Sequence, residues 1–299
     1  MPRRAVAATL LAAAATGCSL VTSFDGFTGS DASGPGDGAT QVDGESGDAI
    51  GGDVGSAGDT ASTGDAPVDA TASDGATLDS PADGGGTDAP TGPITFVQVA
   101  AAAPSGSVAT ASVTFAKAQG AGDLIALAIG WGAATTSITI TGVSDSAGNG
   151  YTNAVGPTRI SAGIAQSIYY AKAVAPAAAG ANAIKVTFAA ATTPVELCAV
   201  EYAGLDPSAP FDTAAAFGGR STSANSGPVT TTTGRELVFG AGITQGSFTG
   251  PGSTFTLRNL AGGGAGVVED LTVSSTGTYS ANAPIASSSY YVMQVATFR

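Results

Sequence analysis

The sequence contains no histidine among its 299 residues. This absence excludes the Ser-His-Asp and Cys-His nucleophile systems in their usual form, and it excludes histidine-ligated zinc and copper sites. Only two cysteines are present, Cys18 and Cys198, which is too few for a thiolate metal cluster. The chemistry that stays open is carboxylate catalysis, calcium held by oxygen ligands, or no catalysis at all.

Positively charged residues are also scarce, because ten Lys and Arg stand against 23 Asp and Glu. After Arg4 no basic residue occurs before Lys117, whereas thirteen Asp and one Glu fall between Asp25 and Asp88. Residues 94–299 carry eight basic and nine acidic side chains and are nearly neutral. Since no basic face is available to meet phosphates, we expect no nucleic-acid partner.

The N-terminal segment has the pattern of a cleaved export signal. Arg3 and Arg4 form a short positive start, and residues 5–15 form an apolar core. That core suits a signal peptide and is too short to span a bilayer, which takes about 20 residues. Small residues then lead into Cys18. The segment resembles the bacterial lipobox, in which the cysteine is diacylated and becomes the N-terminus after cleavage.

The lipobox resemblance implies that residues 1–17 are removed and that Cys18 holds the protein on a membrane through its lipid. The sequence departs from the pattern at Ala15, where Leu is usual three residues before the cysteine. Ser19 follows Cys18. By resemblance to Gram-negative lipoproteins, this favours a cell-envelope protein anchored to the outer membrane, on its periplasmic or surface face. The alternative is an ordinary secretory signal and a secreted protein.

Residues 18–93 are predicted to form a disordered tether behind the lipidated cysteine. They consist largely of Gly, Asp, Ala, Ser, Thr and Pro, and Ile50 and Leu78 are among the few sizeable apolar side chains. Such a segment cannot bury enough surface to offset its ordering entropy. The regular aspartates invite a calcium-repeat interpretation, but the glycine-rich nonapeptide pattern of calcium-binding β-helices is missing. We therefore expect a spacer.

From residue 94 the sequence changes to short β-branched and apolar runs separated by turn residues. No amphipathic stretch of helical length with caps occurs. Two runs, 124–129 and 237–239, are apolar on both faces and are predicted to be central strands. The pattern predicts an all-β fold over residues 94–299, a two-sheet antiparallel β-sandwich that is jelly-roll-like. Twelve strands are expected, at 94–100, 112–116, 124–131, 137–143, 164–174, 183–189, 195–202, 236–243, 255–259, 267–273, 277–280 and 290–298.

Six segments of this region resemble a recurrent module of secreted bacterial proteins. They are DSAGNGY at 145–151, IYYAKAV at 168–174, AIKVTF at 183–188, VEYAGL at 200–205, RELVFG at 235–240 and VMQVATF at 292–298. The resemblance runs over nearly all of residues 94–299. It implies an adhesin-like or accessory β-sandwich and no established activity.

The loop at 145–150 is open to two interpretations. Asp145 and Asn149 offer oxygen ligands for a calcium ion, which would be the only cofactor expected. Alternatively the loop is a plain hairpin, in which the Asp side chain bonds the backbone while Gly148 and Gly150 supply positive φ. The hairpin is the favoured interpretation, because only two side chains of ligand type lie in the loop.

The acidic residues of the domain form no evident catalytic pair. Glu196 and Glu201 lie five residues apart on one predicted strand and so point to opposite faces, as do the adjacent Glu269 and Asp270. A glycosidase needs two carboxylates about 5–9 Å apart. Only Glu201 with Glu269 or Asp270 from another strand could supply that. Cys198 lies on the same strand as Glu201 and is expected to pack in the core.

Four aromatic residues are candidates for stacking on sugar rings: Trp131, Tyr151, Tyr290 and Tyr291. Trp131 is the only tryptophan. The alternative for each is packing in or beside the core. In the pairs 169–170 and 290–291 the two rings must point to opposite sheet faces, so one of each pair is expected to be outward.

We therefore expect an envelope lipoprotein that displays a non-catalytic, carbohydrate-binding or protein-binding module at the cell surface. Its expected partners are the membrane, through the lipid, and a glycan or an envelope protein. The alternative is a purely structural or interaction protein without a small ligand. The other alternative is a carboxylate-dependent glycan hydrolase. It is the weaker one, because the sequence shows no catalytic constellation.

Overall fold

The computed structural model describes residues 92–133 and 138–299. These ranges contain fifteen β-strands and one short 3-10 turn, η1 (Gly262–Gly264), but no α-helix. The prediction of an all-β sandwich is therefore confirmed. The predicted signal peptide, Cys18 and the tether up to residue 91 lie outside the described residues. Within the described ranges, no helix is long and apolar enough to cross a membrane.

The first eight strands form a sandwich of two sheets. The larger sheet has the order β1-β8-β3-β6-β5 and the smaller one the order β2-β7-β4. The first strand therefore pairs with the last, the second with the seventh and the third with the sixth, which is the rolled-up pairing of a jelly roll. The strands are β1 (Thr95–Ala102), β2 (Val108–Thr114), β3 (Leu124–Gly132), β4 (Ile140–Asp145), β5 (Tyr151–Ile160), β6 (Ile164–Ala171), β7 (Ala183–Thr192) and β8 (Val195–Ala203).

The last seven strands repeat this topology. Their sheets have the orders β12-β13-β11-β15-β9 and β10-β14. Again the first strand pairs with the last and the second with the next to last. β12 lies beside β13 as β5 lies beside β6, and only β4 has no counterpart. The strands are β9 (Phe211–Asn225), β10 (Val229–Thr230), β11 (Glu236–Thr244), β12 (Thr256–Leu260), β13 (Gly266–Val273), β14 (Thr278–Tyr279) and β15 (Asn282–Phe298).

The repeat holds at the level of single residue pairs. Leu124 at the start of β3 lies opposite Tyr202 on β8, and Leu237 on β11 lies opposite Phe298 on β15. Four residues further along β3, Ala128 lies opposite Cys198, and four residues further along β11, Ala241 lies opposite Gln294. The described chain is therefore two jelly-roll-like halves, β1–β8 and β9–β15, with matching registers.

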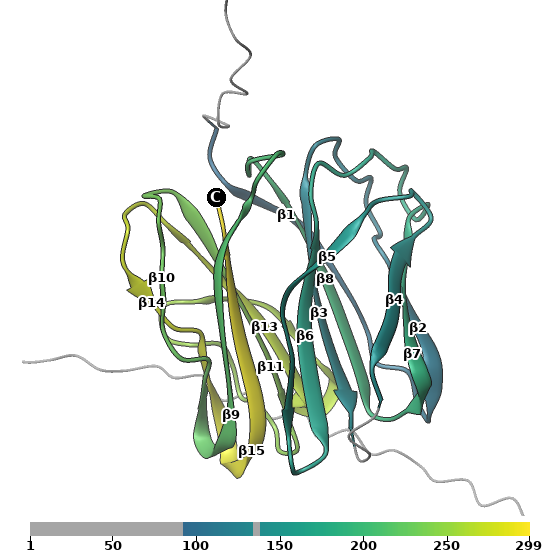
Figure 1. Ribbon diagram of the computed structural model, residues 1–299, viewed down its shortest axis with the longest axis vertical. Coiled ribbons are helices and arrows are strands. Elements are labelled where there is room, and N and C mark those ends of the chain that lie inside the picture. The colour runs from purple at the N-terminus through teal and green to yellow at the C-terminus, as the bar shows by residue number, and fades with distance from the viewer. Residues whose placement is uncertain (1–91, 134–137) are drawn as a thin grey trace, which may run out of the picture. The chain divides into compact units, whose positions relative to one another are not determined.

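The two halves pack back to back through their larger sheets. Figure 1 shows the four sheets as successive layers, with β10 and β14 at one side and β2, β7 and β4 at the other. β1 lies against β12, β3 against β11 and β5 against β9, as a twofold exchange of the halves would require. The core between the larger sheets includes Leu124, Ile168, Tyr202, Phe239 and Phe298.

Every residue of β3 and of β11 is buried, which confirms both as central strands. On β3, Ile125, Leu127 and Ile129 pack against the smaller sheet of their own half. Leu124 and Ala126 face the other half. Burying side chains of this size contributes about 1.5–3 kcal/mol each. The run is apolar on both faces because it lies between two cores.

Candidate functional site

The candidate site is a cleft at one end of the halves' interface, here called the distal cleft. Its volume is about 640 Å³, which lies within the range of ligand sites, about 300–1,000 Å³. Loops from both halves form it: the β5–β6 hairpin, the β7–β8 turn, the end of β11 and the residue before β13. The lining residues are Ser161, Ala162, Gly163, Ile164, Thr193, Pro194, Thr244, Gln245, Gly246 and Ala265.

The distal cleft lies at the end of the strands remote from Gly92, where the described chain begins. Near Gly92, Thr95 pairs with Ala203. Strand β8 starts at the other end, where Val195 pairs with Trp131. The cleft therefore faces away from the residue that follows the predicted tether.

One hydrogen bond joins the two halves at the distal cleft, and three more fix the wall that the second half contributes. Gln245 Nε2 donates to the carbonyl oxygen of Ala162 in the other half at 2.5 Å. The carbonyl oxygen of Tyr290 accepts two bonds, from Gln245 N at 3.0 Å and from Thr244 Oγ1 at 2.8 Å. Thr244 N donates to the carbonyl oxygen of Ala265 at 2.9 Å. The walls of the cleft are therefore fixed to one another and to Tyr290.

Tyr290 places an exposed aromatic ring beside this cleft. Its side chain is 43% exposed, and the guanidinium carbon of Arg220 lies 5.7 Å from the ring centroid. Tyr290 lies on the same face of β15 as Val292, two residues further along, and Val292 clusters with Ile164 and Ile243. The ring therefore lies on the side of the β5–β6 hairpin, which lines the cleft.

The distal cleft is suited to a neutral, hydroxyl-bearing ligand. None of the residues that line it is charged. Ser161, Thr193 and Gln245 supply hydroxyl and amide groups, and the neighbouring Tyr290 ring supplies an apolar face. A few placed polar groups beside aromatic surface are typical of small-ligand sites.

The other three predicted aromatic residues are not free at the surface. Trp131 is 0% exposed, its Nε1 donates to the carbonyl oxygen of Ile138 at 3.2 Å, and it belongs to the core of the first half. Tyr291 is buried in the outer core of the second half. Tyr151 is half-buried and donates its hydroxyl proton to Asp145 Oδ2 at 3.0 Å. For Trp131 and Tyr291 the structure favours packing.

One ring of the pair at 290–291 is outward, as expected, but the pair at 169–170 behaves differently. Tyr169 packs against the outer core of the first half, whereas Tyr170 packs against the core between the halves. Neither ring is exposed, because the sheet that carries them is covered on both faces.

The loop at 145–150 is an internally bonded hairpin. Asp145 accepts hydrogen bonds from Asn149 N at 2.9 Å, Asn149 Nδ2 at 2.7 Å, Tyr151 Oη at 3.0 Å and Asn182 Nδ2 at 2.9 Å. Asn149 Oδ1 accepts from Ala175 N at 2.8 Å. Burial alone would raise the pKa of Asp145, but the bonds from Asn182, Asn149 and Tyr151 hold it below its usual value. These oxygens are engaged within the protein, so a calcium ion would have to displace their donors.

No group of three or more Cys, Asp or Glu side chains stands at metal-binding distance in the described parts of the chain. The arrangement therefore offers no ready-made cluster for a cation.

The structure does not bring together the carboxylates that a hydrolase would need. Glu201 accepts bonds from Gln98 Nε2 at 2.5 Å and Gly120 N at 2.7 Å, on the β8 face away from the second half. Glu269 lies on β13 and accepts bonds from Gly252 N and Asn282 N, on the face away from the first half. Both larger sheets therefore separate the two side chains.

Asp123 and Glu201 form an acidic pair that the sequence did not reveal. Burial raises the pKa of Asp123 to about 6, and the neighbouring Glu201 carboxylate adds to the shift by hydrogen bonding and repulsion. Asp123 immediately precedes β3, and Glu201 lies near the end of β8. Only the register of those two strands, which no local pattern specifies, places them together.

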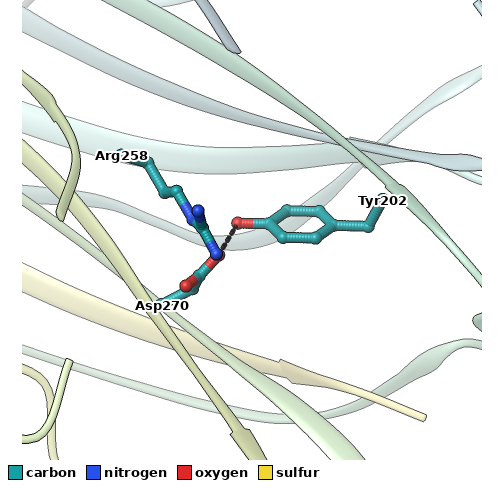
Figure 2. A network of polar contacts seen from close by, with 3 residues as sticks. All are labelled: Tyr202, Arg258 and Asp270. Atoms are coloured by element: carbon teal, nitrogen blue, oxygen red, sulfur yellow. Dashed lines mark hydrogen bonds and ion pairs between the residues drawn. The ribbon is translucent and has the colours of Figure 1, made fainter. Parts of the chain in front are cut away.

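Asp270 belongs to a polar network between the halves, shown in Figure 2. Its Oδ2 accepts bonds from Tyr202 Oη at 2.5 Å and from Arg258 Nε at 2.7 Å. The guanidinium carbon of Arg258 also lies 4.0 Å from the centroid of the Phe96 ring. This network joins β1 and β8 of the first half to β12 and β13 of the second, so we assign it a structural role.

Comparison with known proteins finds no matching family model, no matching curated protein and no matching solved structure. The resemblances to a lipobox and to a secreted bacterial module thus stay predictions.

Proposed function

We propose that this chain is a non-catalytic glycan-binding module that a lipid anchor holds on the cell envelope. The observation that carries the proposal is the exposed Tyr290 ring on a residue whose backbone carbonyl accepts hydrogen bonds from Thr244 and Gln245 of the uncharged distal cleft. A sugar ring presents an apolar face that stacks on an aromatic ring, and its hydroxyls match the Thr and Gln groups of the cleft.

The position of the distal cleft supports a display role. The cleft lies at the end remote from Gly92, and the predicted tether precedes Gly92 in the chain. A tether entering at one end leaves the opposite loops free to meet a ligand. We propose that Cys18 carries the lipid and that the membrane is the outer membrane.

The anchor is tested by replacing Cys18 with Ser and fractionating the producing cells. The proposal expects the unchanged protein to sediment with membranes and the Cys18→Ser protein to appear in soluble fractions. Equal distribution of the two proteins would favour the alternative, a secreted protein without a lipid.

A structural or interaction role is the second candidate, and one observation favours it. The outward face of the β2-β7-β4 sheet carries the exposed small polar residues Thr110, Ser112, Thr114 and Ser144, with Lys185 between Ser112 and Ser144. A polar, hydroxyl-rich face of this kind suits contact with another envelope component. We propose no hydrolase, because Glu201 and Glu269 lie on those faces of the two larger sheets that point away from each other.

The test of glycan binding is an array screen of the purified chain, with and without calcium. We expect saturable binding to at least one class of glycan that is independent of calcium. The Tyr290→Ala variant should lose that binding, whereas Leu257→Ala, which removes another exposed apolar side chain on β12, should keep it. If the folded protein binds no glycan on the array, with or without calcium, the glycan proposal is refuted and the structural one is favoured.

A further inference from the structure

A second cavity lies between the halves, on the side where β1 lies against β12, and is here called the seam cavity. It is narrow, about 20 Å³, and Gln166, Glu196, Cys198, Asn259 and Gly266 are among its lining residues. A shallow groove of about 170 Å³ adjoins it and shares Ala261 and the polar side chains of Glu196 and Asn259. The seam cavity is therefore reached from the surface past these two side chains.

The seam cavity exists because the repeat is imperfect. On the opposite side of the interface, Gln294 of β15 fills the equivalent space, and its Nε2 donates to Thr158 Oγ1 at 2.9 Å and to the carbonyl oxygen of Gln166 at 3.0 Å. By strand register, the counterpart of Gln294 is Cys198, and the counterpart of Gln166 is Gly266. The smaller residues at these two counterparts leave the space open.

Two side chains of the seam cavity, Gln166 and Glu196, offer oxygen atoms that accept hydrogen bonds. Gln166 is 2% exposed, and its Oε1 has no hydrogen-bond donor within the described residues. Leaving such an atom unpaired destabilises the folded chain, so a donor from a ligand would remove that cost. Glu196 is half-buried on the same face of β8 as Cys198, and burial raises the pKa of its carboxyl. No basic residue lines the cavity or the adjoining groove.

The two compartments differ in chemistry. The inner seam cavity is large enough for one group of about the size of a water molecule. The outer groove is lined mainly by small and apolar residues, including Ala101, Ala102 and Leu260, which is 38% exposed. A complementary ligand has a small donor head and an apolar stem.

We propose that the seam cavity binds a primary ammonium group on an unbranched alkyl stem, such as an alkylamine or a lysine side chain. The ammonium supplies three donors and a positive charge to Gln166 Oε1 and to the Glu196 carboxylate. The stem lies along the groove beside Leu260. This site is separate from the distal cleft, so the amine proposal can be right or wrong independently of glycan binding.

The experiment is calorimetric titration of the purified chain with n-pentylammonium in about 150 mM salt. The salt screens weak attraction to the many aspartates of residues 18–93. We expect one saturable site per chain, no binding of tetramethylammonium, which has no N–H donor, and much weaker binding of n-pentanol, which has no charge.

Two variants locate the site. Glu196→Gln should weaken pentylammonium binding by roughly tenfold or more, since a charge-assisted hydrogen bond is lost. Asp206→Asn removes one negative charge from an exposed loop and should leave the affinity unchanged. Absence of saturable binding by the folded chain would overturn the proposal. Equal affinity in Glu196→Gln would also overturn it, because the amine would then bind to acids elsewhere.

Discussion

Tyr202 on β8 donates its hydroxyl proton to Asp270 Oδ2 on β13 at 2.5 Å, across the interface between the two halves (Figure 2). Asp270 is 3% exposed. Its only ion-pair partner in the described ranges is Arg258, at 2.7 Å. The Tyr202–Asp270 bond is thus a buried, charge-assisted link between the two larger sheets.

The Tyr202→Phe variant should be less stable by about 2 kcal/mol, because it removes a buried hydrogen bond to a charged group. Urea unfolding followed by tryptophan fluorescence measures this. The matched control is Tyr279→Phe, whose hydroxyl donates to the carbonyl oxygen of Ser275 at an exposed position. That change should cost no more than about 0.5 kcal/mol. Equal losses in the two variants would contradict a special role for the Tyr202–Asp270 bond.

The two halves should unfold together and should not fold apart. Their interface buries Leu124, Ile168 and Tyr202 of the first half almost completely. The fragment 92–209 would expose that apolar face, so we expect it to aggregate or stay unfolded. The whole chain should show a single cooperative urea transition by fluorescence and by circular dichroism. A soluble, folded fragment 92–209 would show instead that the halves are independent.

Stability should fall as pH rises from 5 to 8. Burial raises the pKa of Glu269 to about 7, although the N–H groups of Gly252 and Asn282 oppose the shift. Because the folded pKa lies above the ordinary value of 4.5, the folded state holds this proton more tightly. The stabilisation is complete below pH 4.5 and is lost as pH rises through 7, by roughly 2–3 kcal/mol. Asp123, with its pKa raised to about 6, acts in the same direction.

The pH effect is assigned by comparing urea unfolding at pH 5 and pH 8. Glu269→Gln should show a much smaller change between these values than the unchanged protein. Its absolute stability at pH 5 should also fall, since an amide offers one acceptor oxygen to the two N–H donors. Asp206→Asn is the control, because hydrogen bonds lower the pKa of Asp206 and its titration ends below pH 5. If the stability of Glu269→Gln changes between pH 5 and pH 8 as much as that of the unchanged protein, other groups cause the pH dependence.

Gly132 should not tolerate a side chain. A Cβ at this position would lie 2.1 Å from the carbonyl oxygen of Thr193, so the β7–β8 turn beside the distal cleft would have to move. We expect Gly132→Ala to cost about 1–3 kcal/mol. Gly142→Ala is the control, because nothing lies within 4 Å of the added atom. Thermal unfolding of the two variants tests this prediction, and similar melting temperatures for both would contradict it.

The sequence predicted the fold class and the strands that have strong local patterns. All twelve predicted strands are present, and the central position of β3 and β11 followed from apolar residues on both faces. The missed strands are β5, β9 and β10. β5 contains Gly156 and Pro157, and β9 is rich in Ala, Gly and Ser, which are weak strand formers. Because β9 and β10 begin the second half, the repeat stayed hidden.

The candidate site was less accessible to sequence reasoning than the fold. Trp131 and Tyr290 were both plausible sugar platforms, and only the layering of the sheets separates the buried ring from the exposed one. The distal cleft is built from the small residues of four separate loops, none of which carries a motif. Gln166 and Glu196 lie on either side of Gly130 in one sheet, so only the register of β6, β3 and β8 brings both to the seam cavity.

The most direct test of the proposed glycan binding is the affinity of Tyr290 variants for the best glycan of the array. Tyr290→Ala should bind at least tenfold more weakly, because loss of the stacked ring removes about 1.5 kcal/mol. Tyr290→Phe keeps the ring and should bind within about threefold of the unchanged protein. If Tyr290→Ala, shown to be folded, binds as tightly as the unchanged protein, the glycan does not sit at the distal cleft and the central proposal is wrong.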